Sequence, residues 1–161
     1  VYVLTLFAGF GLARAHAVFV ASLFGPSQVA GRILDWALAR RLRILTRARI
    51  AAALLPLGVA LLLLAGPPAA PAFAVLYGMS NGILTINRGT LPMAIFGPMG
   101  YATRLGWLAM PVLLAQAAAP TLAAPVIAAI TPASFFLLAG LLAALAGLFL
   151  LALRTARVSL S

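Results

Sequence analysis

The sequence contains no cysteine, one histidine and one acidic residue, Asp35. The absence of cysteine excludes disulfide bonds and thiolate metal ligands within the chain. A single carboxylate excludes catalysis by paired carboxylates, and together with His16 alone it makes no metal-binding cluster. A membrane-embedded enzyme usually displays such acidic or histidine clusters. We therefore expect a protein that is not an enzyme and that binds no metal or cofactor.

Charged residues are also scarce, at 7% of the 161 residues, whereas 65% are hydrophobic. The mean hydropathy is +1.19. So few polar residues cannot cover a water-soluble domain, which leaves the lipid bilayer as the surroundings of the chain. A helix needs about 20 mostly apolar residues to cross a bilayer. Residues 50–66 and 135–153 meet this need almost without a polar side chain, and they predict an all-α integral membrane protein.

Five complete transmembrane helices are predicted, in a single bundle over residues 1–161. Their approximate limits are 14–36, 48–66, 71–96, 102–128 and 133–154. Turns are predicted at GPPAAP (66–71), FGPMG (96–100) and TPAS (131–134), where Thr or Ser can cap the next helix. The apolar run at 1–10 is too short to cross a bilayer. Because the first residue is Val and no signal peptide follows, we expect a fragment that begins with the stump of a sixth helix.

The net charge is +10, and every basic residue is an arginine. Most of them cluster at one side of the predicted spans: Arg40, Arg41, Arg43, Arg47, Arg49, Arg104, Arg154 and Arg157. Because basic residues accumulate on the cytoplasmic side of membrane proteins, the basic link 39–49 and the C-terminus are predicted to be cytoplasmic, with Arg14 as the exception. Membrane lipids are expected partners, and an anionic-lipid site in the link is the alternative to a pure orientation signal. Nucleic acid is not an expected partner, because its binding needs a basic protein surface that faces water.

Three of the predicted spans carry polar residues at helical spacing. One face of the first span holds Ser22, Gly25, Gln28, Arg32 and Asp35. The third span holds Asn81, Thr85 and Arg88, near a small-residue face of Gly78, Gly82 and Gly89, and the fourth holds Gln116. A polar group without a partner among lipid tails costs roughly 2–7 kcal/mol, so these faces are expected to meet around a shared interior. We predict that a solute pathway is lined by Gln28, Asn81, Thr85, Arg88 and Gln116.

The end of the first span carries a motif. GRILDWALARR (31–41) resembles Gly-x-x-x-Asp-Arg-x-Gly-Arg-Arg, the loop signature of the major facilitator superfamily (MFS) of transporters. Gly31 and Asp35 fit this signature, and Arg40 and Arg41 fit with a shift of one residue. Trp36 replaces the usual Arg and Leu38 the usual Gly, so the match is partial. GPSQVAGR (25–32) and SNGILTINRGTLPMAIFGPMGY (80–101) are similar to runs in bacterial members. The order of polar and apolar spans also fits the C-terminal half of such a transporter.

The resemblance covers essentially the whole chain and implies an MFS-like helical bundle, with about five complete transmembrane helices plus the stump. It implies a secondary active transporter of the bacterial inner membrane, which carries a small solute by alternating access and has the N-terminal half of the same transporter as its partner. It also implies a gate made of Gly31, Arg32, Asp35, Arg40, Arg41 and Arg104. Within this chain the expected partners of Asp35 are Arg32, Arg40 and Arg104.

Several alternatives stay open. The chain can instead be a structural or assembly membrane subunit without transport activity of its own. Arg88 can contact the substrate directly, or it can serve packing or gating. A small organic anion suits Arg88, but efflux of drugs or metabolites is equally compatible. His16 is expected at the membrane interface, as are Trp36 and Trp107.

Overall fold

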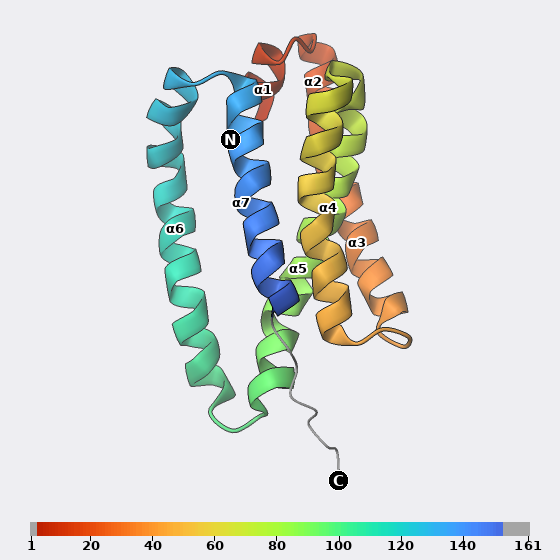
Figure 1. The fold of residues 1–161 in the computed structure, drawn as a ribbon, viewed down its shortest axis with the longest axis vertical. Coiled ribbons are helices and arrows are strands. Elements are labelled where there is room, and N and C mark those ends of the chain that lie inside the picture. Colours follow the sequence, from red (N-terminus) through yellow and green to blue (C-terminus); the bar gives the residue numbers. More distant parts are fainter. Residues whose placement is uncertain (1–2, 153–161) are drawn as a thin grey trace.

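The computed structural model describes residues 3–152, and every regular element in that range is a helix (Figure 1). The elements are α1 (Val3–Gly9), α2 (Arg14–Ser22), α3 (Phe24–Leu38), α4 (Ile44–Ala65), the 3-10 helix η1 (Pro67–Ala69), α5 (Ala70–Phe96), α6 (Tyr101–Ala129) and α7 (Pro132–Ala152). Five helical segments are long and apolar enough to cross a membrane: Arg14–Leu38, Ile44–Ala65, Pro67–Phe96, Tyr101–Leu122 and Pro132–Ala152. This confirms the prediction of a helical membrane protein with five spans.

The first span is divided into α2 and α3, which meet at Leu23. Pro26 explains the break, because a proline offers no N–H to the carbonyl four residues earlier and its ring crowds that carbonyl. The affected carbonyl belongs to Ser22, the last residue of α2. The Ser22 hydroxyl meanwhile donates to the Phe19 carbonyl at 2.7 Å. The predicted span 14–36 is therefore present, with an interruption at Leu23.

The second span begins earlier than predicted, at Ile44 instead of residue 48. Leu45, Ala48 and Ala52 are all buried, and their spacing of three and four places them on one face of a helix. Burial of this face extends the helix into the arginine-rich segment, so the basic link shortens to residues 39–43. Arg47 and Arg49 consequently belong to the first turns of α4.

The helices run alternately up and down (Figure 1). α3 packs along α5, and α4 packs against both α5 and α7, whereas α6 stands apart and contacts chiefly α5. The α3–α4 link, the α5–α6 turn and the last turn of α7 lie at one end of the molecule. We call this the basic end, because Arg40, Arg41, Arg43 and Arg104 lie there. Arg14 and His16 lie at the opposite end, at the start of α2.

Glycines allow α3 and α5 to cross closely. A methyl group at Gly31 would come within 2.8 Å of the Met79 Cα, and one at Gly78 within 2.6 Å of the Ser27 Cβ. At Gly82 it would collide with the Gln28 carbonyl oxygen. These contacts confirm Gly78 and Gly82 as the small-residue face of α5.

Gly89, which was predicted as the third member of that face, does not lie in the crossing of α3 and α5. Gly89 points elsewhere, since a methyl group there would meet only the Tyr101 hydroxyl, at 3.6 Å. The same hydroxyl donates to the Gly89 carbonyl at 2.9 Å and so ties the start of α6 to α5.

An aromatic core holds the opposite end together. The rings of Phe7, Phe73 and Phe136 come from α1, α5 and α7, and their centroids lie 5.4–6.1 Å apart. Phe7 is completely buried. The short N-terminal helix therefore packs into the bundle although it is too short to span a membrane.

The turn before α7 behaves as its residues predict. The Thr131 hydroxyl oxygen accepts a hydrogen bond from the Ser134 backbone N–H at 3.2 Å, and the two hydroxyls lie 2.8 Å apart. Thr131 thus caps the helix in the expected way.

Candidate functional site: a cavity between α5 and α6

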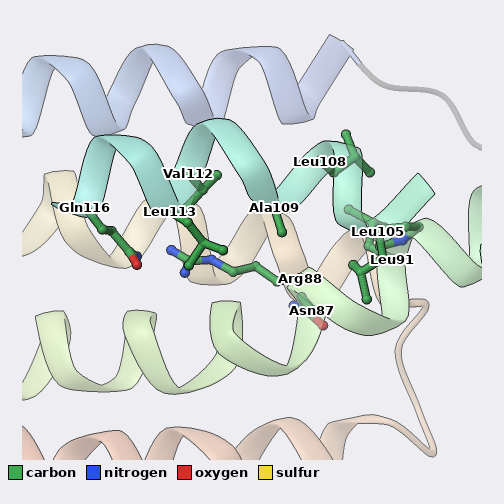
Figure 2. Close-up of a pocket in the computed structure, with 10 residues that line it drawn as sticks. Asn87, Arg88, Leu91, Leu105, Leu108, Ala109, Val112, Leu113 and Gln116 are labelled. Atoms are coloured by element: carbon green, nitrogen blue, oxygen red, sulfur yellow. The ribbon is translucent and has the colours of Figure 1, made fainter. Parts of the chain in front are cut away.

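An open cavity between two helices brings polar and apolar side chains together, and half of the side chains that line it, Arg88 and Gln116 included, are exposed. It has a volume of about 260 Å³ and lies between α5 and α6 (Figure 2). Its walls are formed by Asn87, Arg88, Leu91, Pro92, Leu105, Leu108, Ala109, Val112, Leu113 and Gln116. We call it the α5–α6 cavity. Two residues of the predicted pathway, Arg88 and Gln116, face each other across it (Figure 2).

The polarity of the two helices explains why these side chains converge. Arg88 lies eight residues before the end of α5, and Gln116 lies fifteen residues after the start of α6. At 1.5 Å per residue their backbones differ in depth by about 10 Å. Side chains lean toward the N-terminus of their own helix. α5 begins at the opposite end and α6 at the basic end, so Arg88 leans inward and Gln116 leans back toward it.

Figure 2 shows the result of this arrangement. The Arg88 side chain runs along the space between the helices, and its guanidinium lies beside Leu113 on the side of Gln116. Long basic side chains near the end of a membrane helix normally extend toward water. Arg88 instead extends along the space between α5 and α6, away from the basic end, and stays exposed.

The polar groups of the cavity have no partners in the protein. Within residues 3–152, neither the Arg88 guanidinium nor the Gln116 amide makes a hydrogen bond or an ion pair. A guanidinium offers five N–H donors in a planar fork that matches a carboxylate, and a primary amide offers two donors and one acceptor oxygen. The site can therefore bind an anion or ordered water.

The other predicted pathway residues lie outside the lining of this cavity. Gln28 and Asn81 are half-buried, and the Gln28 backbone contacts Gly82 where α3 crosses α5. Thr85 is exposed, and its hydroxyl donates to the Asn81 carbonyl one turn earlier at 2.6 Å. The structure thus places three of the five residues along α3 and α5, away from the pair that shares the cavity.

Asp35 forms an ion pair with an unexpected partner. Its side chain is 2% exposed, and its Oδ2 accepts a hydrogen bond from Arg47 Nη1 at 2.7 Å. The same Nη1 donates to the Asp35 backbone carbonyl at 3.2 Å. The expected partners were Arg32, Arg40 and Arg104. Arg47 takes their place because α4 begins early, which brings this arginine onto the helix beside α3.

The arginines that were expected to pair with Asp35 have other surroundings. Arg32 is exposed on α3. Arg40 lies over the exposed ring of Trp36, 5.8 Å from its centroid. Arg104 donates to the Phe96 carbonyl at 2.9 Å and so caps the end of α5. Arg49 does the same for α7, through bonds of 3.2 and 3.0 Å to the carbonyls of its last residues. Arginines at the basic end thus satisfy helix carbonyls.

Further predicted residues are placed as follows. Arg41 is exposed, and Gly31 is buried in the crossing of α3 and α5. His16 is exposed at the opposite end, beside the ring of Phe19. Trp107 is 73% exposed on α6. Arg154 and Arg157 lie outside the residues that the structure describes.

Asn87 is a buried polar residue that the spacing argument left out. It is 2% exposed, and neither atom of its amide has a partner. Ser80, two helical turns earlier on the same face of α5, donates to the Ala51 carbonyl of α4 at 2.8 Å. This face of α5 therefore meets α4 at Ser80 and borders the α5–α6 cavity at Asn87. A search for polar residues seven apart, Ser80 and Asn87, would have found it.

Comparisons with family models, with curated proteins and with solved structures found no match to this chain. The residues of the described range also include no group of three or more His, Cys, Asp or Glu side chains that could hold a metal ion.

Proposed function

We propose that the chain transports a small solute across a membrane by alternating access, as the C-terminal part of an MFS-type secondary active transporter. The observation that carries the proposal is the Arg88 guanidinium, which has no partner in the described range and lies in an open cavity between two apolar helices. A charged group in the bilayer interior costs about 2.5–3.5 kcal/mol on insertion scales, and such residues mark substrate or ion pathways.

The distribution of polar and apolar side chains among the helices supports the same proposal. α4 and α7 pack together and carry apolar side chains along most of their length. Polar side chains instead concentrate on α3, α5 and α6. A second bundle that packs on these three helices can enclose a pathway with them. The proposed partner is the N-terminal half of the same transporter.

In this proposal the Asp35–Arg47 pair, the nearby loop motif and Arg104 form a gate at the basic end. Asp35 and Arg47 join α3 to α4 at the base of the bundle, so the two helices move together when the bundles rock. The basic end faces the cytoplasm, since arginines accumulate there, and the membrane is the bacterial inner membrane.

The test is transport by the complete protein that contains this chain, reconstituted in liposomes. Arg88→Gln is expected to reduce uptake or efflux by at least about tenfold, because the charge that meets the solute is lost. Arg14→Gln is the matched control, because this exposed arginine lies at the opposite end, outside the cavity. Wild-type transport by Arg88→Gln, with normal membrane insertion, would contradict the proposal.

A structural or assembly subunit is the second candidate. It is favoured by α6, in which nearly every side chain between Gly106 and Leu122 is exposed, large apolar ones included. Lipid tails can cover such a surface, and so can another protein chain. Co-expression with the proposed N-terminal half, followed by the transport assay, separates the candidates, because an assembly subunit would form the complex and move no solute.

A further inference from the structure

The charge in the α5–α6 cavity is unbalanced. Arg88 contributes one positive charge, and the only acidic residue of the chain is Asp35. Asp35 is already paired with Arg47 and does not line the cavity. A solute with one negative charge neutralises the guanidinium. A cation would be repelled, and a dianion would keep one uncompensated charge in apolar surroundings.

The rest of the wall constrains the body of the solute. Apart from Arg88, Gln116 and the buried amide of Asn87, the lining side chains are hydrocarbon: Leu91, Pro92, Leu105, Leu108, Ala109, Val112 and Leu113. A polar body would lose its hydration there without gaining partners, whereas a hydrocarbon body gains by leaving water. The volume of about 260 Å³ lies just below the range of about 300–1,000 Å³ for small-molecule sites, so the solute is small.

The two polar side chains select the kind of anion. A carboxylate is planar and has two oxygens, which matches a guanidinium fork. A phosphate monoester carries a charge of about −1.5 to −2 near pH 7, more than one arginine can neutralise. Gln116 faces Arg88 from the opposite wall, so its amide N–H groups can donate to the same carboxylate (Figure 2).

From these observations we propose that the α5–α6 cavity binds a small monocarboxylate with a branched or aromatic hydrocarbon body. Arg88 and Gln116 share the carboxylate, and the leucines of α5 and α6 line the space for the body. The proposal rests on the transport function proposed above, and it adds the substrate class and a role for Gln116.

Binding is tested with matched probes on the complete protein in nanodiscs, by calorimetry. The probes are 4-methylpentanoate, its neutral isostere 4-methylpentanamide, and the dianion 3-methylglutarate. A charge-assisted hydrogen-bonded contact corresponds to about a ten- to hundredfold preference, so the monocarboxylate is expected to bind that much more tightly than the amide. It is also expected to bind more tightly than the dianion.

Variants of the cavity residues test whether the cavity causes the preference for the carboxylate over the amide. Arg88→Gln is expected to abolish the preference for the carboxylate over the amide, and Gln116→Leu to weaken carboxylate binding several-fold. Arg14→Gln is expected to leave both probes unaffected. Equal binding of the amide, tighter binding of the dianion, or no carboxylate binding at millimolar concentration by a correctly folded protein would each overturn the proposal.

The transport assay separates a failure of this proposal from a failure of the proposed function. If the carboxylate binds through Arg88 but no carboxylate crosses the membrane, the site stands and transport is refuted. If neutral or cationic solutes are transported in an Arg88-dependent way while the carboxylate does not bind, transport stands and the substrate class is refuted.

Discussion

The Asp35–Arg47 ion pair gives the most quantitative prediction about stability. The two side chains are 2% and 11% exposed, and Nη1 and Oδ2 lie 2.7 Å apart. An exposed pair contributes about 0–1 kcal/mol, whereas removal of one partner of a buried pair costs about 3–5 kcal/mol, because the remaining charge is left buried. Arg47→Met is therefore expected to lower the free energy of unfolding by about 3–5 kcal/mol. It also removes the second bond from Nη1 to the Asp35 carbonyl.

A double-mutant cycle isolates the ion pair. Asp35→Leu alone strands Arg47 and is expected to cost as much as Arg47→Met. The combined variant buries no unpaired charge, and its free energy of unfolding is expected to lie within about 1 kcal/mol of that of the parent chain. The coupling energy then has a magnitude of about 5 kcal/mol or more.

The free energy of unfolding is measured by titration with sodium dodecyl sulfate in mixed micelles, followed by the helical circular dichroism signal. Arg14→Met serves as the control, since Arg14 is exposed and is expected to change stability by less than about 0.5 kcal/mol. Single variants that cost less than about 1 kcal/mol, or costs that simply add in the double variant, would refute the assignment of a buried, coupled pair.

The remaining predictions use the same titration. Gly82→Ala is expected to destabilise the bundle by about 1–3 kcal/mol, because its methyl group meets the backbone of α3. Gly106→Ala, with open space around it, is expected to stabilise the bundle by about 0.5–1 kcal/mol. Equal effects of the two substitutions would contradict the close crossing of α3 and α5. Ser80→Ala is expected to cost about 0.5–1.5 kcal/mol through its bond to Ala51, and no loss would argue against that bond. Arg49→Gln is expected to speed hydrogen exchange in the last turn of α7, since it removes donors to two carbonyls there; unchanged exchange would count against this cap.

The helices were largely predictable because their apolar runs and their turn residues agree. The turns at 66–71, 96–100 and 131–134 combine glycine, proline or a capping threonine, and each separates two helices in the structure. Where the predicted limits differ from those in the structure, burial of side chains against other helices sets the observed limit. The arginines before residue 50 look like a link by charge alone, yet α4 includes two of them because Leu45 and Ala48 are buried on the same face.

Only part of the site was predictable. The spacing of polar residues along one helix does not show which residues of a neighbouring helix they face. Arg88 and Gln116 stood out as polar groups in apolar spans, and the opposite directions of α5 and α6 bring them to one cavity. The choice of Arg47 as the partner of Asp35 depends on how α4 lies beside α3, which no motif encodes. Asn87 was left out of the predicted pathway because it does not fall on the three- and four-residue spacing of Asn81, Thr85 and Arg88.

The central claim is that the polar side of the α5–α6 cavity faces a hydrated interior and not lipid tails. The chain has no cysteine, so a single introduced cysteine is its only thiol. Gln116→Cys is compared with Leu141→Cys, which lies at an exposed position of α7, in membranes treated with a charged, water-soluble methanethiosulfonate. The account predicts rapid modification of Gln116→Cys, slowed by 4-methylpentanoate, and little modification of Leu141→Cys. Equal and slow modification of both variants would contradict it.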